Sequence, residues 1–180
     1  NSKGVIKNNE YYRYNFSFRN TALMLDDKLH VDLGASYVIQ AEQNMISGGR
    51  YFNPLFPLYL FPRGEDFENV KIFERYNEER RFPTQNWEYG DQGLSFENPY
   101  WIINREVFPT KKSRYMLHAR VQYDIFDWLN IAGRVRLDKT HSTEERKLHA
   151  STLELYTGSS KGSYTNKEEF YTQTYADVMA

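Results

Sequence analysis

The chain has 180 residues, a formal net charge of −1, no cysteine and 17% aromatic residues, among them 15 tyrosines. A charge this close to zero does not suggest the basic surface typical of nucleic-acid-binding proteins or a basic patch for anionic membrane surfaces. The lack of cysteine excludes disulfides, thiolate nucleophiles and cysteine-based metal sites, and no apolar run reaches the roughly 18 residues of a transmembrane helix.

The first predicted hairpin joins strands near residues 11–25 and 29–40 through the short turn Asp26-Asp27-Lys28. Apolar and polar side chains alternate along both strands, which is the period of a sheet with two different faces. The alternation is interrupted near Arg19-Asn20, where Asn20 falls on the apolar face. The apolar face carries Tyr12, Tyr14, Phe16, Phe18, Leu29, Val31, Leu33, Ala35, Tyr37 and Ile39.

Residues 41–112 lack any sustained period and contain six prolines, so we expect a long loop there. Structureless connections beyond about 12–15 residues are usually functional or disordered. The many rings in this segment, including Trp87, Tyr100 and Trp101, favour a packed loop over disorder.

The second predicted hairpin has strands near 113–124 and 129–138, joined by Ile125-Phe-Asp-Trp128. One face is apolar or small and the other is strongly charged, as in the first hairpin. A second long loop is expected over 139–168 and a fifth strand over 170–180. The layout of strand, short turn, strand and long loop therefore occurs twice.

Two interpretations fit such alternation. A tilted strand needs about 9–11 residues to cross the hydrocarbon of a membrane, and transmembrane barrels collect Tyr and Trp at their interfaces. A soluble β-sandwich also alternates, with its apolar face against a second sheet. The alternative to a membrane barrel is therefore a soluble, aromatic-rich β-sandwich that binds carbohydrate.

Several short motifs together suggest a family. The succession Glu97-Asn-Pro-Tyr-Trp101, an alternating strand, Tyr123-Asp-Ile-Phe-Asp-Trp-Leu129 and Gly133-Arg-Val-Arg136 resembles the SusC/RagA family of TonB-dependent outer-membrane transporters. Tyr12-Tyr-Arg-Tyr-Asn-Phe16 and Tyr175-Ala-Asp-Val-Met179 also resemble barrel strands of that family. The resemblance implies an all-β fold: an antiparallel meander forming part of a 22-stranded transmembrane barrel, with long extracellular loops.

The resemblance also sets expectations about extent and partners. Residues 1–180 are expected to be a partial barrel, with the plug domain and its TonB-contacting region outside this chain. The implied function is import of oligosaccharides or peptides across the outer membrane of a Gram-negative, Bacteroidetes-like cell. The implied partners are a SusD-like surface lipoprotein, TonB through the plug, the substrate and outer-membrane lipid, with no nucleic acid.

Enzyme chemistry is not expected, because the sequence has no phosphate-binding glycine loop, His-Glu-x-x-His motif or nucleophile elbow. No cofactor is implied. The four histidines lie in separate segments without ligand spacing, and Glu65-Asp66 with Glu68 lacks the spacing of a calcium loop, so no metal site is expected.

Candidate site residues fall into three groups. Trp87, Tyr100 and Trp101 are predicted to contact the substrate or the lipoprotein, with packing of the loop as the alternative role. Phe126 and Trp128, beside the second tight turn, are predicted interfacial anchors. The predicted lumen-facing residues are Asp32, Arg114, His118, Arg120, Arg134 and Arg136. The arginines could form an anion path, but we favour their pairing with acidic plug or lumen residues such as Asp32 and Asp138.

Overall fold

The computed structural model describes residues 1–45, 50–89 and 96–180. Its elements are, in chain order, β1 (Ser2–Lys3), β2 (Glu10–Met24), β3 (Leu29–Gln43), α1 (Leu55–Tyr59), the 3-10 helix η1 (Phe67–Lys71), β4 (Glu74–Asn77), β5 (Phe82–Gln85), α2 (Pro99–Arg105), β6 (Glu106–Val107), β7 (Pro109–Phe126), β8 (Leu129–Leu148), α3 (Glu154–Thr157) and β9 (Ser163–Met179). This content confirms the prediction of an all-β chain. No helix among the described residues is long and apolar enough to cross a membrane.

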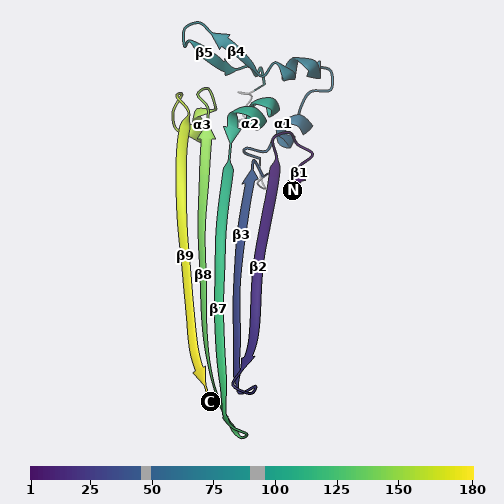
Figure 1. The fold of residues 1–180 in the computed structure, drawn as a ribbon. Helices are drawn as coiled ribbons and strands as arrows, with labels where there is room; N and C mark the ends of the chain where they lie inside the picture. The colour runs from purple at the N-terminus through teal and green to yellow at the C-terminus, as the bar shows by residue number, and fades with distance from the viewer. Residues whose placement is uncertain (46–49, 90–95) are drawn as a thin grey trace. The chain divides into compact units, whose positions relative to one another are not determined.

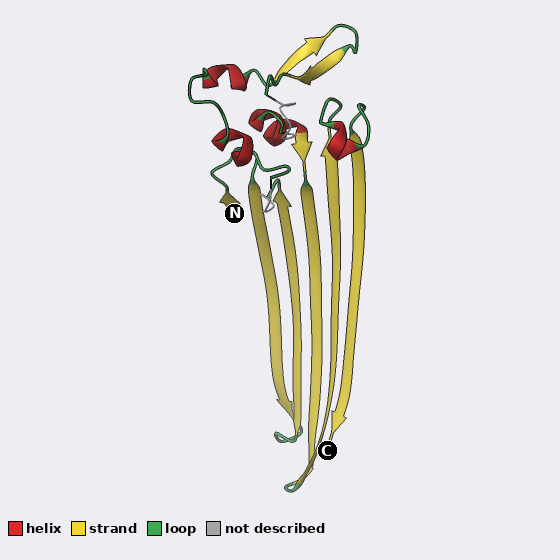
Figure 2. Ribbon diagram, turned by 180° about the vertical axis from the view of Figure 1, so that it is seen from behind, coloured by secondary structure: helices red, strands yellow, loops and turns green. Residues whose placement is uncertain are grey.

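Five long strands lie side by side in the order β2-β3-β7-β8-β9, and sequential strands run in opposite directions (Figures 1 and 2). Both predicted hairpins, β2–β3 and β7–β8, are confirmed. Their tight turns and the C-terminus lie at the same end of the sheet (Figure 1). Within the described part of the chain the sheet is open, with β2 and β9 along its two sides.

The first hairpin turns through residues whose backbones adopt positive φ. Asp26 and Asp27 have φ of 53° and 65°, and the amide of Lys28 donates to the carbonyl of Leu25 at 3.2 Å. Short Asx side chains tolerate this left-handed conformation better than most residues because they bond to the nearby backbone. The turn chemistry therefore fixes the register of the two strands.

The predicted strand ends were wrong on the side away from the tight turns. β8 continues to Leu148 and β9 begins at Ser163, so most of the predicted loop 139–168 is strand. β7 likewise begins at Pro109 and β3 continues to Gln43. Residues 139–147 are polar on both faces, so the sequence loses its alternation there, while hydrogen bonding to neighbouring strands maintains the strand without it.

The chain divides into two units. The sheet unit comprises Tyr12–Ala41, Lys111–Thr143 and Glu168–Ala180, and the loop unit comprises Asn1–Tyr11, Glu42–Thr110 and Glu144–Lys167.

The sheet unit has almost no core of its own. Its buried apolar side chains are two alanines, Ala41 and Ala132, among the described residues. The predicted apolar face is instead exposed: Phe18 is 64% and Val178 is 78% exposed. The other exposed apolar residues that share this alternation are Tyr12, Tyr14, Phe16, Leu33, Tyr37, Tyr115, Leu117, Val121, Tyr123, Ile131, Val135 and Phe170.

The loop unit, by contrast, contains a packed core. Val70, Phe96, Trp101, Ile102 and Leu148 are buried in it. It also holds α1, η1, the β4–β5 hairpin, α2 and α3. The prediction that the first long connection is packed is confirmed for its described residues; Gly48 and Gly49 lie outside them.

Candidate functional site

Ion pairs cross between neighbouring strands on the polar face of the sheet unit. Arg19 of β2 donates twice to the carboxylate of Asp32 on β3, at 3.0 and 2.9 Å. Arg114 of β7 forms a two-bonded pair with Asp138 of β8, and Arg134 of β8 forms another with Asp177 of β9. These forked pairs fix the geometry of adjacent strands.

His118 of β7 completes the row between β3 and β7. Its Nε2 lies 3.8 Å from Oδ1 of Asp32. Its ring covers Gly34, where an added Cβ would lie 2.0 Å from the imidazole Cε1. Gly34 is therefore required by the close approach of the ring, and the two residues together set the position of the histidine.

The six predicted lumen-facing residues share one face of the sheet, and five of them line one hollow, as far as the described residues show. The hollow has a volume of about 890 Å³, and Asp32, His118, Arg120, Arg134 and Arg136 belong to its wall. Arg114 lies on the same face through its pair with Asp138, which also lines the hollow. All six residues therefore lie on the polar face of the sheet, and their position toward a lumen stays a prediction.

The arginines differ in what they contact. Arg114 pairs with Asp138, and Arg19 pairs with Asp32. Arg134 pairs with Asp177, an acid that was not singled out from the sequence although it lies in the predicted strand 170–180. Among the described residues, Arg120 donates to Gln122 at 3.0 Å, and neither Arg120 nor Arg136 forms an ion pair.

The predicted anchors Phe126 and Trp128 flank the second tight turn on the surface. Their rings stack with centroids 5.6 Å apart and planes 10° apart. Trp128 is 80% exposed. Stacking stabilises the turn, and the exposure leaves both rings free to contact an amphipathic layer.

In the loop unit, Asn98 has no exposed surface and organises the connection around α2. Its side-chain oxygen caps α2 by accepting from the amide of Tyr100 at 2.8 Å. Its side-chain nitrogen donates to the carbonyls of Val70 and Asn86, at 2.9 and 3.1 Å. Pro99 follows as the first helical residue, where its missing N–H costs nothing. The Asn-Pro pair therefore starts the helix and ties it to two other segments.

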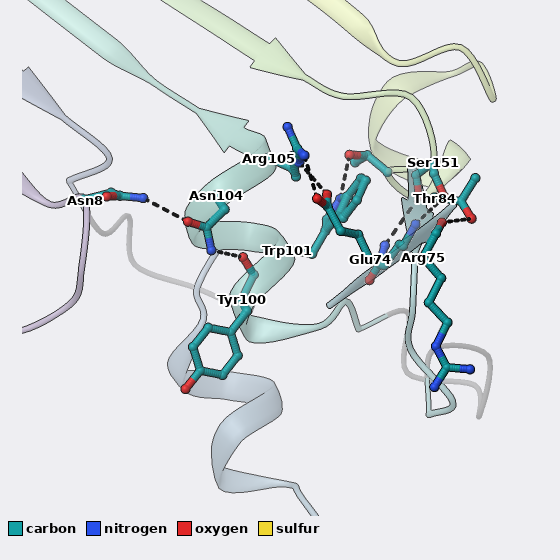
Figure 3. A network of polar contacts seen from close by, with 11 residues as sticks. Asn8, Glu74, Arg75, Thr84, Tyr100, Trp101, Asn104, Arg105 and Ser151 are labelled. Carbon is teal, nitrogen blue, oxygen red and sulfur yellow. Dashed lines mark hydrogen bonds and ion pairs between the residues drawn. The ribbon is translucent and has the colours of Figure 1, made fainter. Parts of the chain in front are cut away.

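Trp101, one of the three rings predicted to contact the substrate or the lipoprotein, is 1% exposed. Its indole N–H donates to Oγ1 of Thr152 at 3.0 Å (Figure 3). Such a side chain holds α2 against the segment before α3 and offers no surface to a ligand. The contact role predicted for Trp101 is therefore replaced by the packing role that was the alternative.

Arg105 at the end of α2 connects this helix to β4. It donates to both carboxylate oxygens of Glu74 on β4, at 2.7 and 2.8 Å, and Figure 3 shows the two side chains pointing toward each other. Gln85 of β5 accepts from the amide of Asn98 and donates to Glu97. The β4–β5 hairpin is thus fastened to both ends of α2.

Trp87 and Tyr100 keep surface accessible and lie at the two ends of one row of ring contacts, which passes through Tyr89, Phe61 and Phe67. Trp87 packs edge-on against Tyr89, with centroids 5.1 Å apart, and lines a small apolar cavity of about 100 Å³. The ring of Tyr100 points away from the hydrogen-bonded network (Figure 3) and lies 6.2 Å from the ring of Phe67. Both rings are half-buried. The structure does not bring the three predicted rings together in one surface cluster.

Two buried carboxyl groups bracket α2. Glu97 is 1% exposed and Glu106 is fully buried. Burial, together with the hydrogen bond and the charge of neighbouring Glu97, raises the pKa of Glu106 far above its ordinary value, while Arg146 opposes the shift. The carboxyl of Glu106 therefore retains its proton near neutral pH. No sequence pattern points to these two carboxyl groups, because they lie nine positions apart in an aperiodic segment.

No group of three or more histidine, aspartate or glutamate side chains in the described ranges is arranged to hold a metal ion. The loop carboxylates Glu65, Asp66 and Glu68 include a capping contact, from the amide of Glu68 to Oδ1 of Asp66 at 2.9 Å, and an ion pair between Lys71 and Glu68.

No protein-family model matches the sequence, and no curated protein is similar to it.

Proposed function

We propose that this chain is part of the wall of an outer-membrane transporter of the SusC/RagA type. In this proposal the apolar face of the sheet unit contacts lipid, the charged face lines the interior of a barrel, and the loop unit lies outside the cell. The protein carries oligosaccharides or peptides inward and is not an enzyme.

The observation that carries the proposal is the uncovered apolar face of the sheet unit. Monomeric soluble proteins rarely expose large contiguous apolar surfaces. Here Phe16, Phe18, Val135, Phe170 and Val178 are each more than half exposed. A sheet with so little buried apolar surface of its own gains stability when that face meets hydrocarbon, whereas a sandwich would need a second sheet over it.

Strand length supports the same proposal. β7 has 18 residues and β8 has 20, which at roughly 3.3 Å per residue gives lengths of about 60 Å. A tilted strand needs about 9–11 residues to cross the hydrocarbon. The remaining residues of β8, with polar side chains on both faces, suit the aqueous side of the membrane.

The contacts on the polar face support a barrel interior that is filled by a plug. Its cross-strand pairs satisfy Arg19, Arg114 and Arg134 within the wall. Arg120 and Arg136, which form no ion pair among the described residues, lie beside the same hollow. We propose that they meet carboxylates of the plug, which would close the barrel interior.

The loop unit supports a binding role outside the membrane. Short turns suffice to join strands, as Asp26–Lys28 does, so a connection from residue 44 to residue 108 with its own core has another purpose. Within Gly48 to Pro109, we propose that Trp87 and Tyr100 contact the incoming substrate or a SusD-like lipoprotein.

The test uses the full-length protein that carries this chain, expressed in its own outer membrane. Trp87→Ala and Tyr100→Ala are compared with Tyr164→Ala, which removes an exposed ring of β9. Truncating a contact aromatic typically costs about 2 kcal/mol, or roughly thirtyfold in affinity. We expect the first two variants to weaken substrate uptake or lipoprotein co-purification by about that factor, with normal amounts of assembled protein and no effect of the control. Unchanged uptake and co-purification for both would contradict the contact role, and recovery of the unaltered protein in the soluble fraction would contradict the transporter.

A further inference from the structure

The loop unit contains a second cavity, of about 270 Å³, which the proposed transport function does not use. Apolar side chains form much of its wall: Phe52, Pro54, Ile102, Ile103 and Phe108. The wall also contains Asn44, Glu106, Arg146 and Lys7. A mostly apolar cavity with a few polar groups in its wall is the usual form of a small-molecule site.

Asn44 contributes a donor with a fixed orientation. Its side-chain oxygen accepts from the backbone amide of Phe108 at 2.8 Å. This bond determines which terminal atom of the side-chain amide is oxygen and which is nitrogen. That nitrogen is buried and has no hydrogen-bond partner among the described residues. An unsatisfied buried donor is unfavourable, and a ligand acceptor would satisfy it.

Arg146 contributes a second donor. Its guanidinium lies over the rings of Phe52 and Phe108, 4.3 and 5.7 Å from their centroids. Stacking fixes the plane of the guanidinium, and its Nε is buried without a hydrogen-bond partner in the described part of the chain.

The charges around the cavity favour an anion. Burial and the neighbouring Glu97 raise the pKa of Glu106 far above its ordinary value, so its carboxyl is uncharged near neutral pH. The charged side chains among the lining residues are then Lys7 and Arg146, and both are positive.

We propose that this cavity binds a small monocarboxylate with an apolar body, whose carboxylate meets Asn44 and Arg146 while its body packs against Phe52 and Ile102. A planar carboxylate accepts from several converging donors at once. The volume admits a molecule of the size of an aromatic acid but no oligosaccharide. The proposal does not depend on the assignment of the sheet unit to a membrane.

The test measures binding of two probes to the purified full-length protein by calorimetry: 3-phenylpropionate and its neutral analogue 3-phenylpropionamide. We expect the acid to bind at least tenfold more tightly than the amide. Equal binding of both probes, or no binding of the acid, would overturn the proposal on the unaltered protein alone.

A matched pair of variants locates the site. Asn44→Asp keeps the acceptor for the Phe108 amide and tolerates the left-handed backbone of this residue (φ 52°), but it replaces the free donor with a negatively charged acceptor. Asn69→Asp adds the same charge at an exposed position that does not line the cavity. We expect at least a tenfold loss of acid binding for Asn44→Asp and no change for Asn69→Asp. Acid binding that survives Asn44→Asp would place the ligand elsewhere and refute the proposed site.

Discussion

At the scale of single residues, the motif around Asn98 shows what a sequence can and cannot reveal. The Asn-Pro pair suits a helix start, because asparagine caps and proline fits the first turn, but no helix was predicted in this aperiodic segment. The hydrogen bonds from Asn98 to the carbonyls of Val70 and Asn86 join positions 28 and 12 residues apart. No local sequence pattern predicts them. The same holds for the bond from Trp101 to Thr152, which is why a buried indole was predicted as a surface contact.

Asn98→Ala should destabilise the loop unit. It removes the helix cap and leaves two backbone carbonyls without their donor, which together amounts to about 3 kcal/mol. Amide hydrogen exchange of residues 96–107 in the full-length protein would show the loss of protection. Asn69→Ala, at an exposed position, is the control and should leave exchange unchanged. Equal protection in both variants would show that Asn98 does not organise the connection.

Glu106 makes the loop unit sensitive to alkaline pH. Burial raises the pKa of its carboxyl above the ordinary value of 4.5, so the folded state retains a proton that the unfolded chain releases as the pH rises past that value. Stability therefore falls with rising pH, by at most about 1.4 kcal/mol per pH unit for one proton. Glu106→Gln mimics the protonated acid and should remove this slope. The free energy of opening of residues 96–107, measured by hydrogen exchange between pH 6 and 9 and corrected for intrinsic rates, checks it. An identical slope in the variant and the unaltered protein would refute the assignment.

At the scale of elements, a segment can form a strand without an alternation of apolar and polar side chains. The sequence predicted where the two faces differ, and the strands there are confirmed. It missed residues 139–148 and 163–169, because the alternation that marks a strand comes from contrasting environments on its two faces. Where both faces are polar, hydrogen bonding alone maintains the strand, and a polar segment such as Thr140 to Arg146 looks like a loop.

The two faces of β7 should respond oppositely to a charge. Val121 lies on the exposed apolar face and its neighbour Gln122 on the charged face, where it donates to Asp124 at 3.1 Å. Arginine on the lipid face of a barrel costs about 2–4 kcal/mol at the membrane midplane. We expect Val121→Arg to reduce the amount of assembled protein in the outer membrane, and Gln122→Arg to be tolerated. Heat-dependent mobility of the folded protein on gels measures assembly. Equal assembly of the two variants would contradict the difference between the faces.

At the scale of the whole molecule, the sheet unit and the loop unit are stabilised by different means. The loop unit buries Trp101, Phe96 and Ile102 in a core like that of a water-soluble domain. The sheet unit has ion pairs between strands on one face and exposed apolar side chains on the other. The sequence predicted this contrast through its composition. It did not predict the carboxylate Asp177, the acid pair or the cavity beside Asn44, because each depends on contacts between distant segments.

The central claim is that the apolar face of the sheet unit contacts lipid and the charged face contacts water. The chain has no cysteine, so single cysteines can be introduced along β7 from Tyr115 to Tyr123 in the full-length protein and labelled with a nitroxide. Collision with oxygen, which concentrates in lipid, is compared with collision with a water-soluble nickel complex. We predict a period of two, with oxygen contact strongest at Tyr115, Leu117, Ala119, Val121 and Tyr123 and weakest at the residues between them. Uniform access of the nickel complex to both faces, or low collision rates for both reagents at the apolar positions, would contradict the claim.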